Sequence, residues 1–203
     1  MFDKFALNLT KPAVDRIADY AICHKVTADQ MTFAGLGLGL FASLLIASGA
    51  PLLALLPLLL GRVADGVDGA IARSSGAQSD RGAFLDIALD FIFYASVPMA
   101  FAIGNPLANA LAGAVLLAAF VTTGTSFLAY AALAAKRGEK SSDYPTKGIY
   151  YLGGITEGAE TILLFVLCCL WPSWFATLAY VYAALCAFTT LTRIKAGWTR
   201  FGS

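Results

Sequence analysis

The chain has 203 residues, of which 59% are hydrophobic and only 13% are charged, and its mean hydropathy is +0.73. A soluble domain usually carries about 25% charged and about 45–50% apolar residues, so this composition excludes an ordinary soluble protein. It predicts one membrane-embedded domain over residues 1–203. The net charge of +1 alone is not informative, and we expect no nucleic acid as a partner.

The N-terminal segment, residues 1–25, mixes polar and apolar side chains. Over residues 10–24 the apolar side chains recur at helical spacing, and Lys11, Asp15, Arg16 and Asp19 fall mostly between them. This pattern predicts an amphipathic helix that lies in the membrane interface. The acidic residues also make the segment unlike a cleavable signal peptide.

Six apolar runs follow, and each approaches the ~20 residues that a helix needs to cross a bilayer. Gly, Pro, Ser and Asn residues or polar stretches separate them. The runs are residues 31–48, 52–73, 83–103, 106–135, 151–170 and 174–194. The sequence therefore predicts an all-α membrane protein with a six-helix transmembrane core over residues 31–194, preceded by the interfacial helix.

Apart from Arg62, lysine and arginine occur at one set of alternating connections and at the two ends of the chain. The connections near residues 49–51, 104–106 and 171–173 contain neither residue. Because cytoplasmic loops carry the excess of Lys and Arg, both termini are predicted to face the cytoplasm. We therefore expect a multi-pass membrane protein.

The second and third predicted spans contain five charged residues in otherwise apolar sequence: Arg62, Asp65, Asp68, Asp86 and Asp90. A charge at mid-membrane costs ~2.5–3.5 kcal/mol on insertion scales, so such residues usually have a function and a partner. The first two aspartates are three residues apart and the last two are four apart, so each pair shares one helical face. A short loop around Gly76 makes the two helices antiparallel neighbours, and the four carboxylates can converge near the cytoplasmic side.

Four ionised carboxylates repel one another unless a cation lies between them. Mg²⁺ favours carboxylate oxygens together with substrate phosphates. Two such ions could bind a diphosphate and stabilise a leaving phosphate. The residues alone thus predict a metal–diphosphate site at the cytoplasmic face.

The spacing D-x2-D-G-x2-A-R-x8-G-x3-D-x3-D is matched at every fixed position, from Asp65 to Asp90. It resembles the signature of the CDP-alcohol phosphatidyltransferase family, and the overall pattern resembles a bacterial inner-membrane subgroup of that family. The resemblance implies two Mg²⁺ or Mn²⁺ ions held by Asp65, Asp68, Asp86 and Asp90, with Asp90 also the general base. It further implies CDP-diacylglycerol as donor, an alcohol acceptor, release of CMP and a homodimer. The residues that it assigns to the donor site are Asp29, Thr32, Gly69, Arg73 and Ser79.

A second group of charged residues lies in or near the fifth predicted span and in the last one. Glu157 and Glu160 lie three apart in an apolar helix, with Lys147 just before them and Arg193 in the last span. We expect these four residues to line the acceptor pocket. Basic residues would suit a phosphorylated acceptor, whereas the glutamates would suit a cationic acceptor or a polyol. An internal ion pair of a glutamate with Arg62 or Arg193 is the structural alternative.

Three other functions fit parts of the pattern. A CDP-choline or CDP-ethanolamine donor with diacylglycerol as acceptor fits the motif, but relatives of that type tend to be longer. A cation transporter fits the intramembrane aspartates, but the acidic residues are confined to the cytoplasmic half. A structural protein or inactive relative would not need the complete set of aspartates. We therefore predict a metal-dependent phosphatidyl transfer in phospholipid biosynthesis.

Overall fold

The structure is a computed structural model that describes residues 2–138 and 154–202, and the side chains from residue 11 onward. All regular structure within these ranges is helical. Seven α-helices and one 3₁₀ helix occur in this order: α1 (Phe2–Cys23), α2 (Ala28–Ala47), α3 (Pro51–Ser74), α4 (Asp80–Gly104), α5 (Pro106–Lys136), α6 (Gly158–Leu170), η1 (Pro172–Trp174) and α7 (Phe175–Phe201).

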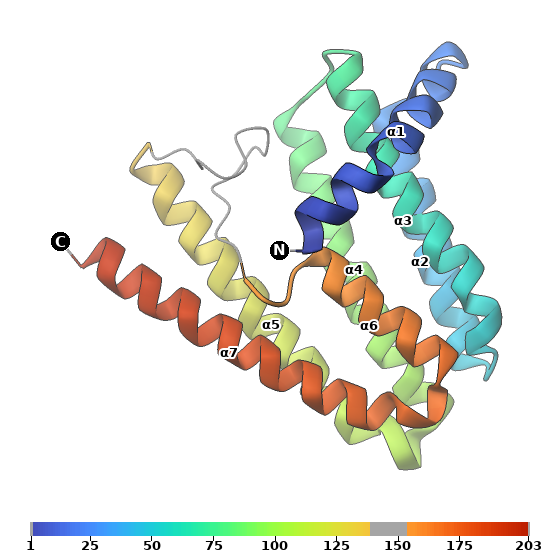
Figure 1. Ribbon diagram of the computed structural model, residues 1–203, viewed down its shortest axis with the longest axis vertical. Coiled ribbons are helices and arrows are strands. Elements are labelled where there is room, and N and C mark those ends of the chain that lie inside the picture. The colour runs from blue at the N-terminus through green and yellow to red at the C-terminus, as the bar shows by residue number, and fades with distance from the viewer. Residues whose placement is uncertain (1, 139–153, 203) are drawn as a thin grey trace.

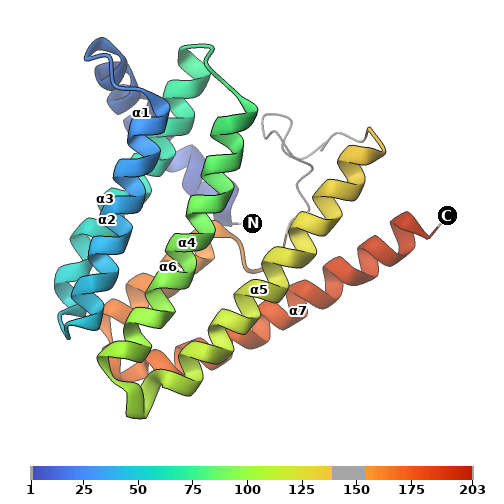
Figure 2. The same cartoon turned by 180° about the vertical axis from the view of Figure 1, so that it is seen from behind.

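The helices form two groups that share one end of the molecule (Figure 1). Helix α2 packs on α3 and α4, and α1 crosses α3. Helix α5 packs along α7, and this pair diverges from α4 with distance from the α4–α5 connection (Figure 2). The two groups are therefore farthest apart at the end of the molecule where α3 ends and α4 begins.

Short turns keep consecutive helices antiparallel. Gly49 and Gly76 adopt φ values of +87° and +65° in the α2–α3 and α3–α4 turns, a region that glycine enters without steric cost. At the start of α4, the Ser79 hydroxyl accepts a hydrogen bond from the Gly82 N–H at 3.1 Å, a typical N-cap. The turn at Gly76 thus brings the second acidic helix back beside the first.

Helices α2 and α3 approach closely through two glycines. A Cβ atom added to Gly61 would lie 2.9 Å from the Gly35 carbonyl oxygen, and one added to Gly35 would lie 3.0 Å from the Gly61 carbonyl oxygen. Small residues permit such close contact between membrane helices. This contact fixes the start of α2 against the acidic part of α3.

The six predicted spans are only partly recovered among the described residues. Four helical segments are long and apolar enough to cross a membrane: Ala28–Ala47, Asp80–Gly104, Pro106–Lys136 and Pro172–Phe201. Helix α3 has the length of a span but contains Arg62, Asp65, Asp68 and Arg73. The apolar helix α6 has only 13 residues, because residues 154–157 are not helical. The count of six therefore stays a prediction.

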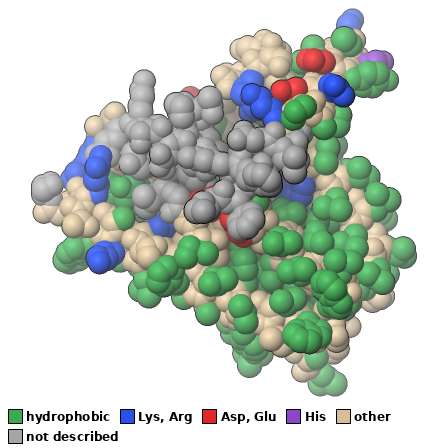
Figure 3. Space-filling model, viewed as in Figure 1, with side chains coloured by type: hydrophobic (Ala, Val, Ile, Leu, Met, Phe, Trp, Pro, Cys, Tyr) green, Lys and Arg blue, Asp and Glu red, His purple; other side chains and the backbone are tan. Residues whose placement is uncertain are grey.

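The N-terminal helix is present and extends through Pro12. Its Ala18 and Ala21 are buried against Val67, Ala70 and Ile71 of α3. Its position in a membrane interface stays a prediction. In the space-filling view, acidic and basic side chains gather near the end of the molecule where α1 lies, and hydrophobic side chains cover the lower part of the same face (Figure 3).

Candidate active site

Three of the four predicted metal ligands meet between α3 and α4. Asp65, Asp68 and Asp86 each offer a carboxylate oxygen, and these oxygens lie within 4.8 Å of one another. The three-residue spacing places the first two on one face of α3, and the antiparallel turn brings Asp86 opposite. Asp68 is buried, Asp65 is half-buried and Asp86 is exposed, so the group opens toward solvent on its α4 side.

Asp90 is not one of these three residues, and its carboxylate binds Arg62. The Arg62 Nη1 atom donates to Asp90 Oδ1 at 2.7 Å and lies 3.5 Å from Asp65 Oδ2. The guanidinium also lies over the ring of buried Phe93, 4.2 Å from its centroid. Arg62 was considered above as a partner for the glutamates. It instead pairs with two of the signature aspartates.

The donor set fits a hard divalent cation. All three groups offer carboxylate oxygens, which Mg²⁺ and Mn²⁺ prefer. At a metal–oxygen distance near 2.1 Å, two oxygens on one ion lie at most about 4.2 Å apart. The observed spread of up to 4.8 Å therefore suits one ion after a small side-chain rotation, or two neighbouring ions that share the carboxylates.

Two of the predicted donor residues lie beside this group at the start of α2. The Thr32 hydroxyl is 2.5 Å from Asp68 Oδ2, which gives the buried carboxylate a hydrogen-bond donor. Asp29 forms an ion pair with Arg81 at the start of α4. These contacts tie α2 to both acidic helices. Any contact of Thr32 and Asp29 with a donor stays a prediction.

The remaining donor residues form the rim of the site. A Cβ atom on Gly69 would lie 3.0 Å from Arg73 Nη1, so the Arg73 guanidinium extends back over Gly69. Ser79 caps α4, and this contact already explains a small hydroxyl residue at that position. Its predicted contact with the nucleotide stays untested.

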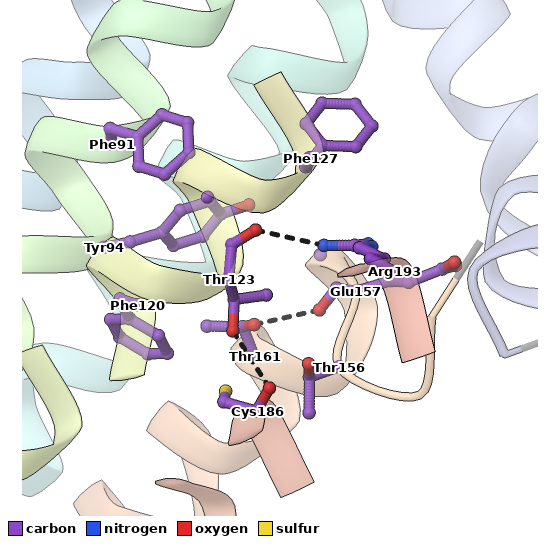
Figure 4. A pocket seen from close by; sticks show the side chains of 12 residues that line it. Phe91, Tyr94, Phe120, Thr123, Phe127, Thr156, Glu157, Thr161, Cys186 and Arg193 are labelled. Carbon is purple, nitrogen blue, oxygen red and sulfur yellow. Dashed lines mark hydrogen bonds between the residues drawn. The ribbon is translucent and has the colours of Figure 1, made fainter. Parts of the chain in front are cut away.

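A cavity of about 140 Å³ lies between α4, α5, α6 and α7. Aromatic side chains form much of its wall, with Phe91, Tyr94 and Phe120 opposite Arg193 and Glu157 (Figure 4). Tyr94 links the two sites, because it lines the cavity and its hydroxyl lies 3.4 Å from Asp90 Oδ2. A molecule in the cavity could therefore approach Asp90 past Tyr94.

Two of the four predicted acceptor residues line this cavity. Glu157 and Arg193 are both buried, at 6% exposure. Arg193 Nη1 donates to the Thr123 carbonyl oxygen at 3.2 Å, and Glu157 Oε1 accepts the Gly154 N–H at 2.7 Å. Glu160 does not line the cavity; its carboxylate accepts the Glu157 N–H at 3.2 Å, at the start of α6. Lys147 lies outside the described residues.

Sequence reasoning had not assigned a role to several side chains at these sites. Tyr94 follows Asp90 by four residues, a spacing that places both on one helical face. Arg62 precedes Asp65 by three residues, and this spacing also places the two residues on one helical face. Phe120, Thr123 and Phe127 also share one face of α5, as their spacing of three and four residues indicates. Helical periodicity in the sequence was therefore a signal from which the positions of these side chains could have been predicted.

Comparisons with known proteins agree with this geometry. The family model described as CDP-alcohol phosphatidyltransferase matches residues 25–192. The chain is 53% identical over 198 residues to the inner membrane protein YnjF of Escherichia coli strain K12. The aligned region covers 98% of this chain and 96% of YnjF.

Solved structures of a Mycobacterium tuberculosis phosphatidylinositol phosphate synthase, PgsA1, share the fold. The structure with CDP-DAG bound has a TM-score of 0.74 and 20% identity, and it covers 92% of this chain and 94% of that one. The complex with manganese and citrate has a TM-score of 0.72 and 22% identity, with 92% and 89% covered.

Proposed function

This chain belongs to the CDP-alcohol phosphatidyltransferase family, and on that premise we propose that it transfers a phosphatidyl group from CDP-diacylglycerol to an alcohol. CMP is the second product. The observation that carries the proposal is the convergence of Asp65, Asp68 and Asp86 within 4.8 Å, on a complete family signature. The proposed location is a bacterial inner membrane, supported by the E. coli relative and the four apolar helices.

The donor is proposed to bind over the acidic group. Its diphosphate would face the three carboxylates, with Arg73 at the rim as a cation for phosphate oxygens. Gly69 would leave room for the cytidine end. The related synthase with CDP-DAG bound supports this class of donor, and its complex with manganese supports a divalent metal. A bound divalent ion would neutralise the diphosphate and polarise the phosphorus for attack.

The chain's own residues are proposed to manage the acceptor. Asp90 takes the proton of the acceptor hydroxyl as the oxygen forms its bond to the phosphorus that carries the diacylglycerol. The bond from that phosphorus to the oxygen of CMP breaks, and CMP leaves with the electron pair. Asp90 is also proposed to ligate metal, which requires its carboxylate to leave Arg62. Tyr94 keeps the carboxylate directed toward the cavity.

The cavity beside Tyr94 is the proposed acceptor site. Its volume of about 140 Å³ suits a small alcohol rather than a second lipid tail. Glu157, Arg193 and the hydroxyls of Thr123, Thr156 and Thr161 supply both charged and neutral hydrogen-bonding groups on its wall. A small polar acceptor also favours CDP-diacylglycerol as donor, because the CDP-choline type of reaction would need room there for diacylglycerol.

The proposed topology follows from the charge distribution. Helices α3, α5 and α7 each have a basic residue in the last turn: Arg73, Lys136 and Arg200. Because cytoplasmic segments carry the excess of Lys and Arg, we propose that these helix ends face the cytoplasm, together with both termini and the active site. We also propose a homodimer. Labelling of single cysteines at the two ends in intact cells tests the topology, and light scattering in detergent tests the dimer.

The reaction is tested with purified protein in detergent, Mn²⁺ or Mg²⁺ and CDP-diacylglycerol. CMP release is measured with glycerol 3-phosphate, glycerol, inositol phosphate, inositol, serine and choline as acceptors. Release with one acceptor, lost in Asp90→Asn and on addition of EDTA, is the expected result. A parallel reaction with CDP-choline and diacylglycerol tests the other donor class. Failure of metal-dependent CDP binding would refute the proposal.

A further inference from the structure

We infer that Arg62 is a positioning residue that holds Asp90 out of the metal group until substrate and metal are bound, an inference that rests on the proposed function. Arg62 Nη1 is 2.7 Å from Asp90 Oδ1 and 3.5 Å from Asp65 Oδ2. One guanidinium therefore separates the aspartate nearest the cavity from the three that converge. The positively charged guanidinium of Arg62 thus lies at the edge of the proposed metal-ion site.

The environment of Arg62 fixes it in this place. Its side chain is 14% exposed, and its guanidinium lies 4.2 Å from the centroid of Phe93, whose ring is fully buried. A guanidinium over an aromatic face is stabilised by the ring's quadrupole. Phe93 is itself held by Gly39 of α2, where an added Cβ atom would lie 2.5 Å from the ring. The cation is thus anchored from the side opposite the aspartates.

Asp90 is held from two sides. Arg62 binds Oδ1, and the Tyr94 hydroxyl lies 3.4 Å from Oδ2 at the cavity wall. The carboxylate therefore has two alternative cations: Arg62 as described, and a metal ion bound by the other three aspartates. Exchange between them would couple metal binding to the position of the proton acceptor.

This arrangement has a measurable consequence for metal affinity. Arg62 competes with a divalent ion for Asp90 and adds positive charge beside Asp65. Removal of the guanidinium should free Asp90 to join the other carboxylates, so Arg62→Met should bind Mn²⁺ at least about fivefold more tightly than the wild type.

A double-mutant cycle separates this role from a general charge effect. Mn²⁺ affinity is measured by titration calorimetry on the full-length protein in detergent, for the wild type, Arg62→Met, Asp90→Asn and the double variant. The tightening by Arg62→Met should fall below about twofold in the Asp90→Asn background. Arg137→Met removes a positive charge that binds backbone oxygens at the end of α7, and it should leave Mn²⁺ affinity unchanged.

The possible results are distinct. If Arg62→Met tightens Mn²⁺ equally with and without the Asp90 carboxylate, or does not tighten it at all, the positioning role is refuted. Arg62→Gln replaces Arg62→Met if the latter does not fold, and the same criteria hold. A wild-type protein that binds no Mn²⁺ refutes the proposed function, and this inference with it. A wild type that binds Mn²⁺ and releases CMP but shows no Arg62 effect refutes only the inference.

Discussion

Gly61→Ala tests whether the close contact of α2 and α3 holds the site together. The Cβ atom would lie 2.9 Å from the Gly35 carbonyl oxygen, about 0.5 Å inside an ordinary carbon–oxygen contact. That oxygen belongs to the helix backbone, so it cannot rotate away as a flexible side chain would. The two helices would have to separate by several tenths of an ångström.

The energetic cost follows from this overlap. Overpacking by one methyl group in a well-packed region typically costs about 1–3 kcal/mol. For a chain of about 200 residues this corresponds to a fall in the unfolding midpoint of roughly 2–10 °C. The separation would also move Thr32 away from Asp68, because both lie on the paired helices. We therefore expect weaker Mn²⁺ binding in addition to lower stability.

The assay is thermal unfolding in detergent together with Mn²⁺ titration. Gly37→Ala is a matched control on the facing helix, because its Cβ atom would meet nothing within 4 Å. The control should unfold at or slightly above the wild-type midpoint, since alanine favours a helix over glycine. Equal midpoints for the two variants would show that α2 and α3 are not in close contact at Gly61.

Three further substitutions test individual side chains of the site. Thr32→Val removes the hydroxyl 2.5 Å from Asp68 and should weaken Mn²⁺ binding about tenfold, as loss of a partner to a metal ligand commonly does; unchanged calorimetry would contradict this role. Tyr94→Phe should lower kcat for CMP release about threefold with Mn²⁺ affinity unchanged, because one hydrogen bond to Asp90 is lost. Glu157→Gln keeps an acceptor for Gly154 N–H and should raise the acceptor KM about tenfold; a lower unfolding midpoint with unchanged KM would indicate a purely structural glutamate.

The acidic group could be predicted because its causes are local. Spacings of three and four residues set the faces of α3 and α4, and the Gly76 turn sets their antiparallel pairing. Asp90 pairs with Arg62 in the structure, and its predicted role as a metal ligand stays a prediction. The sequence marks Arg62 as a charge within an apolar helix but not its partner. Four aspartates and two glutamates were available as partners, and only the packing of α3 and α4 on α2 decides between them.

The fifth span shows a different limit. An apolar run predicted a helix from residue 151, yet α6 begins at Gly158. Glycine has a low helix propensity, and Gly154 lies where a Cβ atom would be 2.5 Å from the Thr189 side chain. The segment therefore packs against α7 as irregular chain, and Glu157 binds the Gly154 N–H. Hydropathy measures neither the backbone conformation nor this tertiary contact.

The irregular segment and the displaced aspartate belong to one arrangement. Because residues 154–157 are not helical, Thr156 and Glu157 line the cavity instead of continuing α6. Arg62 binds Asp90, and the Asp90 carboxylate also contacts the hydroxyl of Tyr94, which lines that cavity. Both departures from the regular pattern thus bring polar groups toward the same space between α4 and α7. A continuous fifth helix would lack the irregular segment that brings Thr156 and Glu157 to this cavity wall.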